Sequence, residues 1–192
     1  SYRTVLLEYG VDIGLDEYRV RWIAVDGGPE YACHTYKLPF TPLELRARKT
    51  EVYRTLIRRG VDPMPGARAA LERLRPTHRL ALATNTVRDE VGVILGHLDM
   101  ASLLHATIAR EDYDRPKPAP DAYLAAATRL GLVPSECVVI EDTQRGLASG
   151  LAANMAVICV PSDLTRDNDF TGAAAVVSGL DELTAALLAR IG

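Results

Sequence analysis

Three features that mark common protein classes are missing from this sequence: a long apolar run, a basic stripe and a dense cysteine pattern. Without about 18 consecutive apolar residues, no membrane-spanning helix and no membrane partner are predicted. Lysine and arginine form no cluster and the net charge is −3, so nucleic acid is not an expected partner. Cys33, Cys137 and Cys159 are scattered, and the last two lie in apolar runs, which is typical of core residues in a reducing, cytoplasmic compartment.

Hydrophobic periodicity divides the chain into two predicted domains. Residues 1–61 have the pattern of helices separated by polar breaks, which predicts a small all-helical cap domain. From 62 to 192, helices and strands alternate, which predicts an α/β core, a doubly wound, Rossmann-like parallel sheet. The predicted helices are 1–9, 15–24, 29–36, 42–59, 67–75, 87–97, 119–130, 144–153 and 180–190, and the predicted strands are 79–83, 105–109, 137–140, 156–160 and 175–177. Thr41 is the expected N-cap of the fourth helix.

The strand predicted at 137–140 stops on two adjacent carboxylates, Glu141 and Asp142. The carboxyl ends of parallel strands open into a ligand crevice, where two neighbouring negative charges repel unless a cation or a shared proton compensates them. Hard oxygen ligands suit Mg²⁺, which typically takes one or two carboxylates and completes its sphere with water and phosphate. The alternative is that Asp142 caps the following helix and Glu141 is solvated.

A second strand end carries the polar turn Thr84-Asn85-Thr86, after the apolar run 80–83. A hydroxyl group and free backbone N–H groups at a strand-to-helix turn form a phosphate cradle, so Thr84 and Asn85 are candidate phosphate-binding residues. The alternative is that Thr84 or Asn85 caps the helix that begins near Val87, and this segment alone favours the cap.

A loop lysine, Lys117, lies between Pro116 and Pro118, and a further proline follows at Pro120. Prolines at alternate positions are expected to hold the backbone extended and stiff, so that the lysine side chain has a fixed direction. Most loop lysines are solvated. A cation fixed beside a carboxylate pair is better explained as a partner for a phosphate or for those carboxylates.

Two glycines, Gly146 and Gly150, lie four residues apart on the helix predicted at 144–153. We expect them to let that helix lie close against the sheet and to bring its N-terminus to the phosphate site. The alternative is that they are merely helix-weakening residues.

Together these segments resemble the second, third and fourth motifs of the haloacid dehalogenase superfamily. The matching parts are Thr84, the Lys-Pro-Ala-Pro-Asp run at 117–121 and the Ile-Glu-Asp-Thr-Gln-Arg-Gly-Leu-Ala-Ser-Gly run at 140–150. The branch with an α-helical cap, which contains phosphoglycolate phosphatases and β-phosphoglucomutase-like proteins, is the most similar, and the likeness extends over nearly the whole chain. Each motif is a weak signal alone, but their order and spacing, with the proline-flanked lysine, are specific.

The first motif of that superfamily, Asp-x-Asp-x-Thr or Asp-x-Asp-Gly-Thr, is missing from the sequence. The resemblance implies that its two Asp residues are the nucleophile and the general acid and base, at the end of a central first strand. Neither 25–28 nor 112–114 fits the motif. We expect this strand and motif upstream of Ser1, in about 15 to 20 residues, because a sheet without its central strand has unpaired inner edges. Without that strand, the strands that end at Thr84 and Ile140 are not expected to pair.

The resemblance implies a Mg²⁺-dependent phosphomonoester hydrolase that acts on a small phosphorylated metabolite through an aspartyl-phosphate. On this interpretation Asp142 holds Mg²⁺ with Glu141, directly or through water. Lys117 and Thr84 are the catalytic residues that stabilise the phosphoryl oxygens, and Asn85 helps to bind the phosphate. The protein is expected to be a monomer or a homodimer.

Three other functions are less expected. A phosphosugar mutase of the β-phosphoglucomutase type is the runner-up, but its cap carries a Gly-x-x-Arg, and the equivalent stretch 22–29 contains no arginine. Haloacid dehalogenase activity is disfavoured because the carboxylate pair suits metal-dependent phosphoryl transfer. The alternative from another class is a catalytically dead binding protein that truly lacks the first motif.

Overall fold

The computed structural model describes residues 1–23 and 27–191, which form two compact units. The first unit contains residues 1–61 together with 163–168, and the second contains residues 62–162 and the chain from 169 onward. The loop 163–168, which follows the predicted core strands in the sequence, is thus grouped with the helical unit. The stretch 22–29, whose lack of arginine disfavours a mutase, includes residues 24–26, which lie outside the described residues.

Helices build the described part of the first unit: α1 (Tyr2–Leu7), α2 (Leu15–Tyr18), α3 (Gly28–Thr35) and α4 (Pro42–Arg58). The predicted cap of α4 is confirmed, because the Thr41 side chain accepts a hydrogen bond from the Glu44 N–H and the Glu44 carboxylate accepts one from the Thr41 N–H. The helix predicted at 15–24 is confirmed over residues 15–23, where α2 continues directly into the π-helical segment Arg19–Ile23. Trp22 in that segment packs against α3, where a Cβ on Gly28 would lie 2.4 Å from the indole ring.

Helices and parallel strands alternate through the described part of the second unit. The strands are β1 (Ala81–Ala83), β2 (Ala106–Ile108), β3 (Val138–Glu141), β4 (Ala156–Cys159) and β5 (Ala175–Val176). The helices are α5 (Ala67–Leu74), α6 (Arg88–Leu98), α7 (Asp121–Leu130), α8 (Gln144–Ala152) and α9 (Ala185–Leu188). Pairing is parallel, with Ala81 beside Ala106 and Val138 beside Ala156. The predicted α/β fold with a parallel sheet is therefore confirmed.

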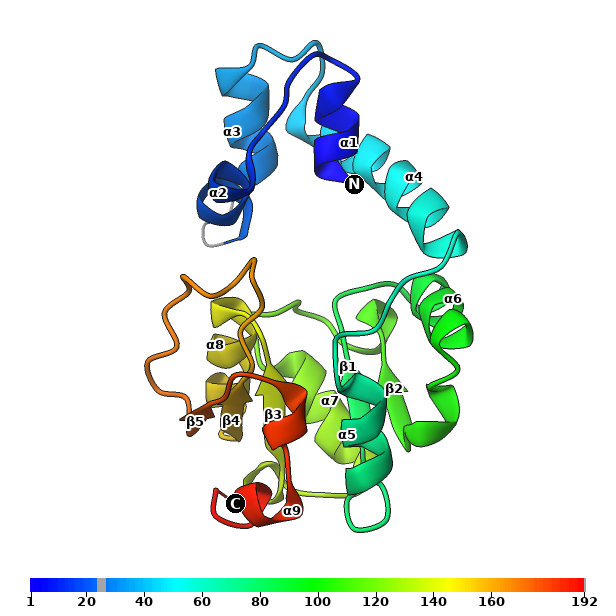
Figure 1. The fold of residues 1–192 in the computed structure, drawn as a ribbon, viewed down its shortest axis with the longest axis vertical. Coiled ribbons are helices and arrows are strands. Elements are labelled where there is room, and N and C mark those ends of the chain that lie inside the picture. Colours follow the sequence, from blue (N-terminus) through cyan, green and yellow to red (C-terminus); the bar gives the residue numbers. More distant parts are fainter. Residues whose placement is uncertain (24–26, 192) are drawn as a thin grey trace. The chain divides into compact units, whose positions relative to one another are not determined.

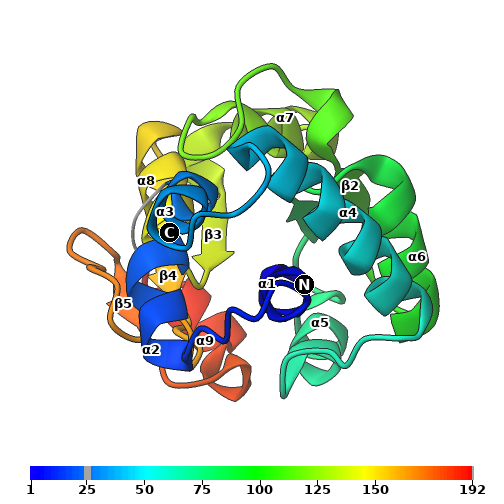
Figure 2. The ribbon, with the colours of Figure 1, turned by 90° about the horizontal axis from the view of Figure 1, so that it is seen from above.

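The parallel strands form two separate groups, β1–β2 and β3–β4–β5 (Figure 1). Figure 2 shows β2 of the first group apart from β3 of the second. Within the described residues β1 does not pair with β3, as expected for a sheet that lacks its central strand. A cavity of about 690 Å³ lies between the two groups, and most of its walls are apolar side chains, including Leu80, Leu82, Val138 and Ile140. The second unit therefore contains an apolar groove between the two inner strand edges.

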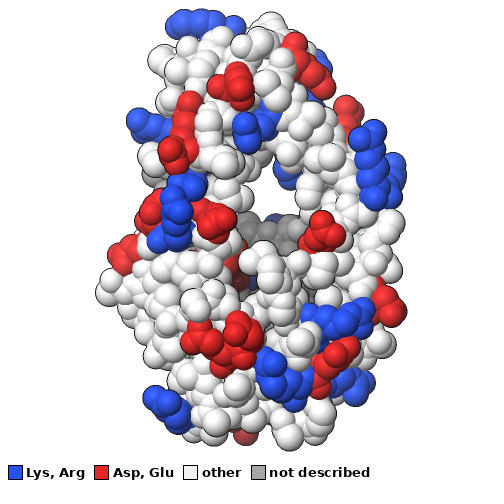
Figure 3. Space-filling view, in the orientation of Figure 1, with Lys and Arg blue, Asp and Glu red and all other residues white. Residues whose placement is uncertain are grey.

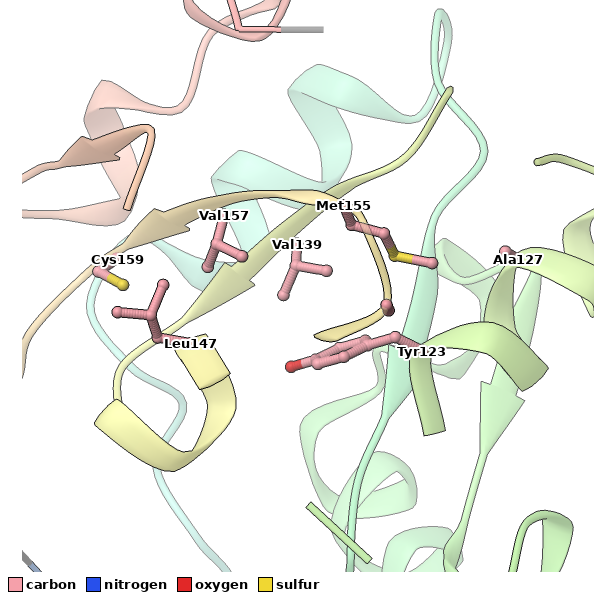
Figure 4. Packing of buried hydrophobic residues seen from close by; sticks show 8 residues of the cluster. Tyr123, Ala127, Val139, Leu147, Met155, Val157 and Cys159 are labelled. Carbon is pink, nitrogen blue, oxygen red and sulfur yellow. The ribbon is translucent and has the colours of Figure 1, made fainter. Parts of the chain in front are cut away.

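Helix α7 packs on both strand groups. Ala122 belongs to the same buried cluster as Ile108 of β2, whereas Tyr123 and Ala127 belong to the cluster of Val139 of β3. Figure 4 shows this second cluster, with the Tyr123 ring beside Val139. The apolar face of α7 thus joins two strand groups that do not bond to each other through their backbones.

Helix α8 lies close against β3 and β4, as the two glycines predicted. A Cβ on Gly150 would lie 2.6 Å from Val157 Cγ2 and 3.5 Å from the nearest atoms of Val139. The interpretation of this glycine as merely helix-weakening is therefore wrong. The close approach brings the start of α8 next to the end of β3.

The single helix predicted at 180–190 is wrong, because a short 3₁₀ turn precedes a separate helix, α9. Thr184 divides them, since its side chain accepts a hydrogen bond from the Leu187 N–H and caps α9. Arg73 of α5 donates to the carbonyl oxygen of Leu183 at 2.9 Å. This tertiary bond uses a carbonyl group that a continuous helix would need for its own ladder.

Charged side chains of both signs are interspersed on the face shown in Figure 3. None of the helices in the described part of the chain combines the length and the apolar character that crossing a membrane requires. The cysteines are free thiols, and burial raises the pKa of Cys159 to about 11, which suits an inert core residue.

Candidate active site

A pocket of about 440 Å³ lies at the carboxyl ends of β1 and β3, within the second unit. Every residue that the sequence singled out as a site candidate lines it: Thr84, Asn85, Lys117, Glu141 and Asp142. They come from two strand ends and from the loop before α7. Parallel topology explains this convergence, because the carboxyl ends of β1 and β3 lie at the same edge of the fold.

Thr84 follows β1 and stabilises the turn after it. Its Oγ1 accepts a hydrogen bond from the Thr86 N–H at 3.1 Å. Helix α6 has no side-chain cap at its N-cap position, and its first N–H group, that of Arg88, donates instead to the Glu111 carboxylate at 3.0 Å. The interpretation of Thr84 or Asn85 as the helix cap is therefore wrong, and both residues line the pocket instead.

Asn85 ties the β1 end of the pocket to the lysine loop. Its Oδ1 accepts hydrogen bonds from the Tyr113 hydroxyl at 2.7 Å and from the Lys117 N–H at 3.2 Å. The Tyr113 hydroxyl also lies 2.8 Å from the carbonyl oxygen of Thr84. The amide oxygen of Asn85 thus positions the loop, while its NH₂ group has the polarity that a phosphate oxygen needs.

The proline-flanked loop turns at Lys117, so the extended backbone predicted there is wrong. The Ala119 N–H donates to the carbonyl oxygen of Pro116 at 3.0 Å, which closes a turn around Lys117 and Pro118. The peptide bond between Lys117 and Pro118 is cis. Alternating prolines exclude a helix but are compatible with both a turn and an extended chain, and the local sequence does not distinguish the two.

The Lys117 side chain is nevertheless fixed, as predicted, and it is only 11% exposed. Its Nζ lies 2.6 Å from Glu141 Oε1, 3.0 Å from the Ala83 carbonyl oxygen and 2.8 Å from the Tyr123 hydroxyl. The interpretation as an ordinary solvated lysine is therefore wrong. A nearly buried cation instead bridges the ends of β1 and β3.

Asp142 follows β3 and lines the pocket without capping α8. The cap is Thr143, whose side-chain oxygen accepts a hydrogen bond from the Gly146 N–H at 3.0 Å, so the capping alternative for Asp142 is wrong. Removal from water raises the pKa of Asp142, and the neighbouring charge of Glu141 raises it further. The negative charge of Asp142 is therefore incompletely compensated within the protein.

The protein holds the Glu141 carboxylate by both oxygens. Oε1 pairs with Lys117, and Oε2 accepts hydrogen bonds from the Asp142 N–H and the Thr143 hydroxyl, each at 3.3 Å. The Glu141 side chain is 11% exposed, so the solvated alternative is wrong. A Cβ on Gly146 would lie 2.0 Å from this carboxylate, which explains why the first turn of α8 requires glycine there.

The two carboxylates suit a hard divalent cation better than a transition metal. In the part of the chain that the structure describes, no three His, Cys, Asp or Glu residues gather as a metal site. Zinc usually takes three or four protein ligands, whereas Mg²⁺ is commonly held by one or two carboxylates with water and phosphate. Asp142 fits such a site because its charge lacks full compensation. Glu141 fits through a bridging water, since Lys117 already occupies Oε1.

Sequence patterns did not single out Tyr113 and Tyr123, although both contact predicted site residues. Tyr113 bonds to Asn85, and Tyr123 bonds to Lys117. The position of Tyr123 in the first turn of α7, six residues after Lys117, is a signal that was available in the sequence. No comparable signal exists for Tyr113, whose contact depends on how β1 and the lysine loop come together.

Comparison with known proteins identifies relatives that cover most of the chain. Residues 5–154 match the haloacid dehalogenase-like hydrolase family. Protein CbbY of Rhodobacter capsulatus is 33% identical over 168 residues, which cover 82% of this chain and 74% of the relative. Fructose-1-phosphate phosphatase YqaB of Escherichia coli is 27% identical over 83% of this chain and 85% of the relative.

A solved structure agrees with these relatives. CbbY of Rhodobacter sphaeroides, in complex with phosphate, matches the fold with a TM-score of 0.75 at 25% identity, over 95% of this chain and 86% of that one. The family match covers the strand ends and the loop that form the pocket. The protein is therefore an enzyme that belongs to the haloacid dehalogenase-like hydrolase family.

Proposed function

We propose that this protein is a Mg²⁺-dependent phosphomonoester hydrolase that acts on a small phosphorylated metabolite. Its family and its relatives make it a phosphatase or phosphotransferase. The observation that carries the hydrolase proposal is the fixed position of the Lys117 ammonium group in the pocket. This cation lies between the carboxylates at the end of β3 and the neutral hydrogen-bonding groups at the end of β1. The name of the E. coli relative favours a sugar phosphate as substrate.

In this proposal, three side chains bind the phosphate group. Lys117 supplies a point charge, and the Thr84 hydroxyl and the Asn85 NH₂ group supply neutral donors. Phosphoryl transfer depends on positioning and on electrostatic stabilisation more than on covalent chemistry by the protein. Hydrogen-bond donors that the fold holds in place stabilise the transition state more than water does, because they need no reorganisation during the reaction.

Asp142 would hold the Mg²⁺ ion, with Glu141 acting through water. When bound, the ion neutralises charge on the phosphoryl group and on the carboxylates. The raised pKa of Asp142 supports this assignment, because a carboxylate whose charge is poorly compensated gains most from a cation. Glu141 also pairs with the Lys117 ammonium group, so one carboxylate would both hold this lysine at the pocket and contact the Mg²⁺ ion through water.

The nucleophile would be an Asp on an extended segment that fills the groove between β1 and β3. Its oxygen attacks phosphorus, the bond to the leaving alkoxide breaks, and the alkoxide takes a proton from the second Asp of an Asp-x-Asp-x-Thr motif. Water then gives a proton to the second Asp and attacks the phosphorus of the aspartyl-phosphate, which breaks the acyl–phosphate bond, releases inorganic phosphate and restores both Asp residues. The groove supports this proposal because it opens at the pocket: Leu82, Ala83, Ile140 and Glu141 line both.

Phosphate release from a panel of sugar phosphates tests the proposal. Two proteins are compared: the 192-residue chain, and the same chain with an N-terminal extension of about 20 residues that ends an apolar strand on Asp-x-Asp-x-Thr. We expect release that requires Mg²⁺ from the extended protein, and its loss when the first Asp of the motif becomes Asn. Release by the 192-residue chain alone would contradict the strand proposal. Failure of both proteins would contradict the hydrolase proposal.

The same samples separate the alternatives. A phosphosugar mutase would convert one sugar phosphate into an isomer without net release of phosphate, which ³¹P NMR detects. A non-catalytic binding protein would bind a sugar phosphate without any turnover. Hydrolysis is the expected result because the stretch 22–29 lacks the arginine with which a mutase of the β-phosphoglucomutase type holds the distal phosphate.

A further inference from the structure

Tyr123 is a buried tyrosine whose hydroxyl contacts Lys117 and Glu141, two residues that line the pocket. It lies in the first turn of α7, is only 7% exposed and belongs to the cluster around Val139 and Met155. Figure 4 shows its ring in that cluster, with the hydroxyl oxygen at the end of the ring away from Ala127. Packing of the ring therefore fixes the position of the hydroxyl.

The Lys117 ammonium group has three N–H donors, and three protein acceptors lie within hydrogen-bonding distance. They are Glu141 Oε1 at 2.6 Å, the Tyr123 hydroxyl at 2.8 Å and the Ala83 carbonyl oxygen at 3.0 Å. The ammonium also lies 4.3 Å from the centroid of the Tyr123 ring. A phosphoryl oxygen can therefore bond to this ammonium only by replacing one of the three acceptors.

The Tyr123 hydroxyl is the acceptor that Lys117 exchanges most easily. Glu141 forms a salt bridge with Lys117, and hydrogen bonds within such pairs are roughly twice as strong as bonds with a neutral partner. The Ala83 carbonyl belongs to the backbone of β1 and does not rotate away. The Tyr123 hydroxyl is neutral and keeps a second bond when it releases the lysine, since it donates to Glu141 Oε1.

We propose that Tyr123 is a positioning residue that holds the Lys117 ammonium at the pocket and yields it to a phosphoryl oxygen of the substrate. This role rests on the proposed function and adds to it a residue outside the superfamily motifs. The hydroxyl occupies the third donor of Lys117 in the free protein, and it returns to that place when phosphate leaves. It therefore weakens phosphate binding while it keeps the cation in position.

Tyr123→Phe isolates the hydroxyl because it keeps the ring and its packing. The ammonium then has a nearly buried donor without an acceptor until a phosphate oxygen supplies one, and such a donor costs free energy. The variant should bind inorganic phosphate about fivefold more tightly than the wild type. In turnover, KM should fall with little change in kcat, because a phosphoryl oxygen supplies the missing acceptor in both the ground-state complex and the transition state.

Calorimetric titration of inorganic phosphate into the 192-residue chain, with MgCl₂ present, tests the role of Tyr123 without turnover. Tyr9→Phe is the matched control, because Tyr9 packs on Phe40 in the helical unit and its variant should bind phosphate like the wild type. Equal or weaker binding by Tyr123→Phe would overturn the role. A lower kcat with a higher KM would also overturn it, since that combination indicates general damage to the site.

A double-mutant cycle with Lys117→Ala makes the test specific. Without the ammonium, Tyr123→Phe should leave phosphate affinity unchanged, and a persistent fivefold effect would count against the proposal.

3-Fluorotyrosine at position 123 gives a second readout in a chain that keeps the hydroxyl. Its ¹⁹F resonance should shift when phosphate is added, and a resonance that stays in place would reject the exchange. A wild type that binds no phosphate contradicts the proposed function, whereas binding that ignores position 123 contradicts only the role of Tyr123.

Discussion

The two strand groups of the second unit bring opposite chemistry to one pocket. The β1–β2 group ends in the neutral side chains Thr84 and Asn85, whereas the β3–β4–β5 group ends in the carboxylates Glu141 and Asp142. In the described residues, β1 does not pair with β3, so no ladder of backbone bonds joins the two ends. Lys117 joins them instead, with its ammonium bonded to both. Side chains and helix α7 therefore hold this site together where backbone pairing between β1 and β3 is absent from the described residues.

Asp142→Asn should have the largest effect, because it removes charge from the acidic end and leaves the neutral end intact. In the protein with the N-terminal extension, this variant should lose Mg²⁺-dependent phosphate release while its circular dichroism spectrum stays unchanged. Asp99→Asn is the matched control: the Asp99 side chain is 95% exposed after α6, and its variant should keep full activity. Near-wild-type turnover of Asp142→Asn would show that Asp142 does not hold the ion.

Lys117→Ala breaks the link between the two ends and should have the second-largest effect. We expect kcat to fall by about 10³-fold, and the uncompensated Glu141 charge should lower the free energy of unfolding by about 3 kcal/mol. Lys117→Arg should not restore activity, because a planar guanidinium does not fit a place built for a point charge. Steady-state kinetics and urea unfolding measure both effects, and a fully active arginine variant would refute this placement of the cation.

Gly146→Ala crowds the acidic end, and Gly92→Ala, on the helix that follows the neutral end, is its control. A Cβ at position 146 would lie 2.0 Å from the Glu141 carboxylate, so we expect a loss of about 1–3 kcal/mol in the free energy of unfolding. A Cβ at position 92 meets nothing within 4 Å, so alanine should add about 0.5–1 kcal/mol through helix propensity. Urea unfolding compares the two variants, and equal changes would argue against the close approach of α8.

The smallest expected effect is a pH dependence of stability that arises at the acidic end alone. Burial and Glu141 raise the pKa of Asp142, so the folded chain binds this proton more tightly than the unfolded chain. As pH rises from the ordinary aspartate pKa of about 3.9 through the raised value, the wild type should lose stability relative to Asp142→Asn and then level off. Urea midpoints in EDTA between about pH 4 and 7 measure this difference. Added Mg²⁺ should reverse it, and a difference that does not vary with pH would contradict the raised pKa.

Local patterns predicted the strands and helices well where one face is apolar and the ends carry clear caps. Helix α4 is an example, because Thr41 and Glu44 cap it through neighbouring atoms. Predictions were wrong where distant contacts outweigh local preference. Arg73, for example, binds a carbonyl group within the expected helix 180–190.

The sequence by itself determined the order of strands and helices, the polar residues at the strand ends and the missing first motif, because each is a property of neighbouring residues. It also left several choices open at those strand ends. Only the tertiary structure decided that Thr143 and not Asp142 caps α8, and that Lys117 is held and not solvated. The reason is distance along the chain: Lys117 is 34 residues from Ala83 and 24 from Glu141, and the packing of β1, α7 and β3 alone brings their atoms within 3 Å.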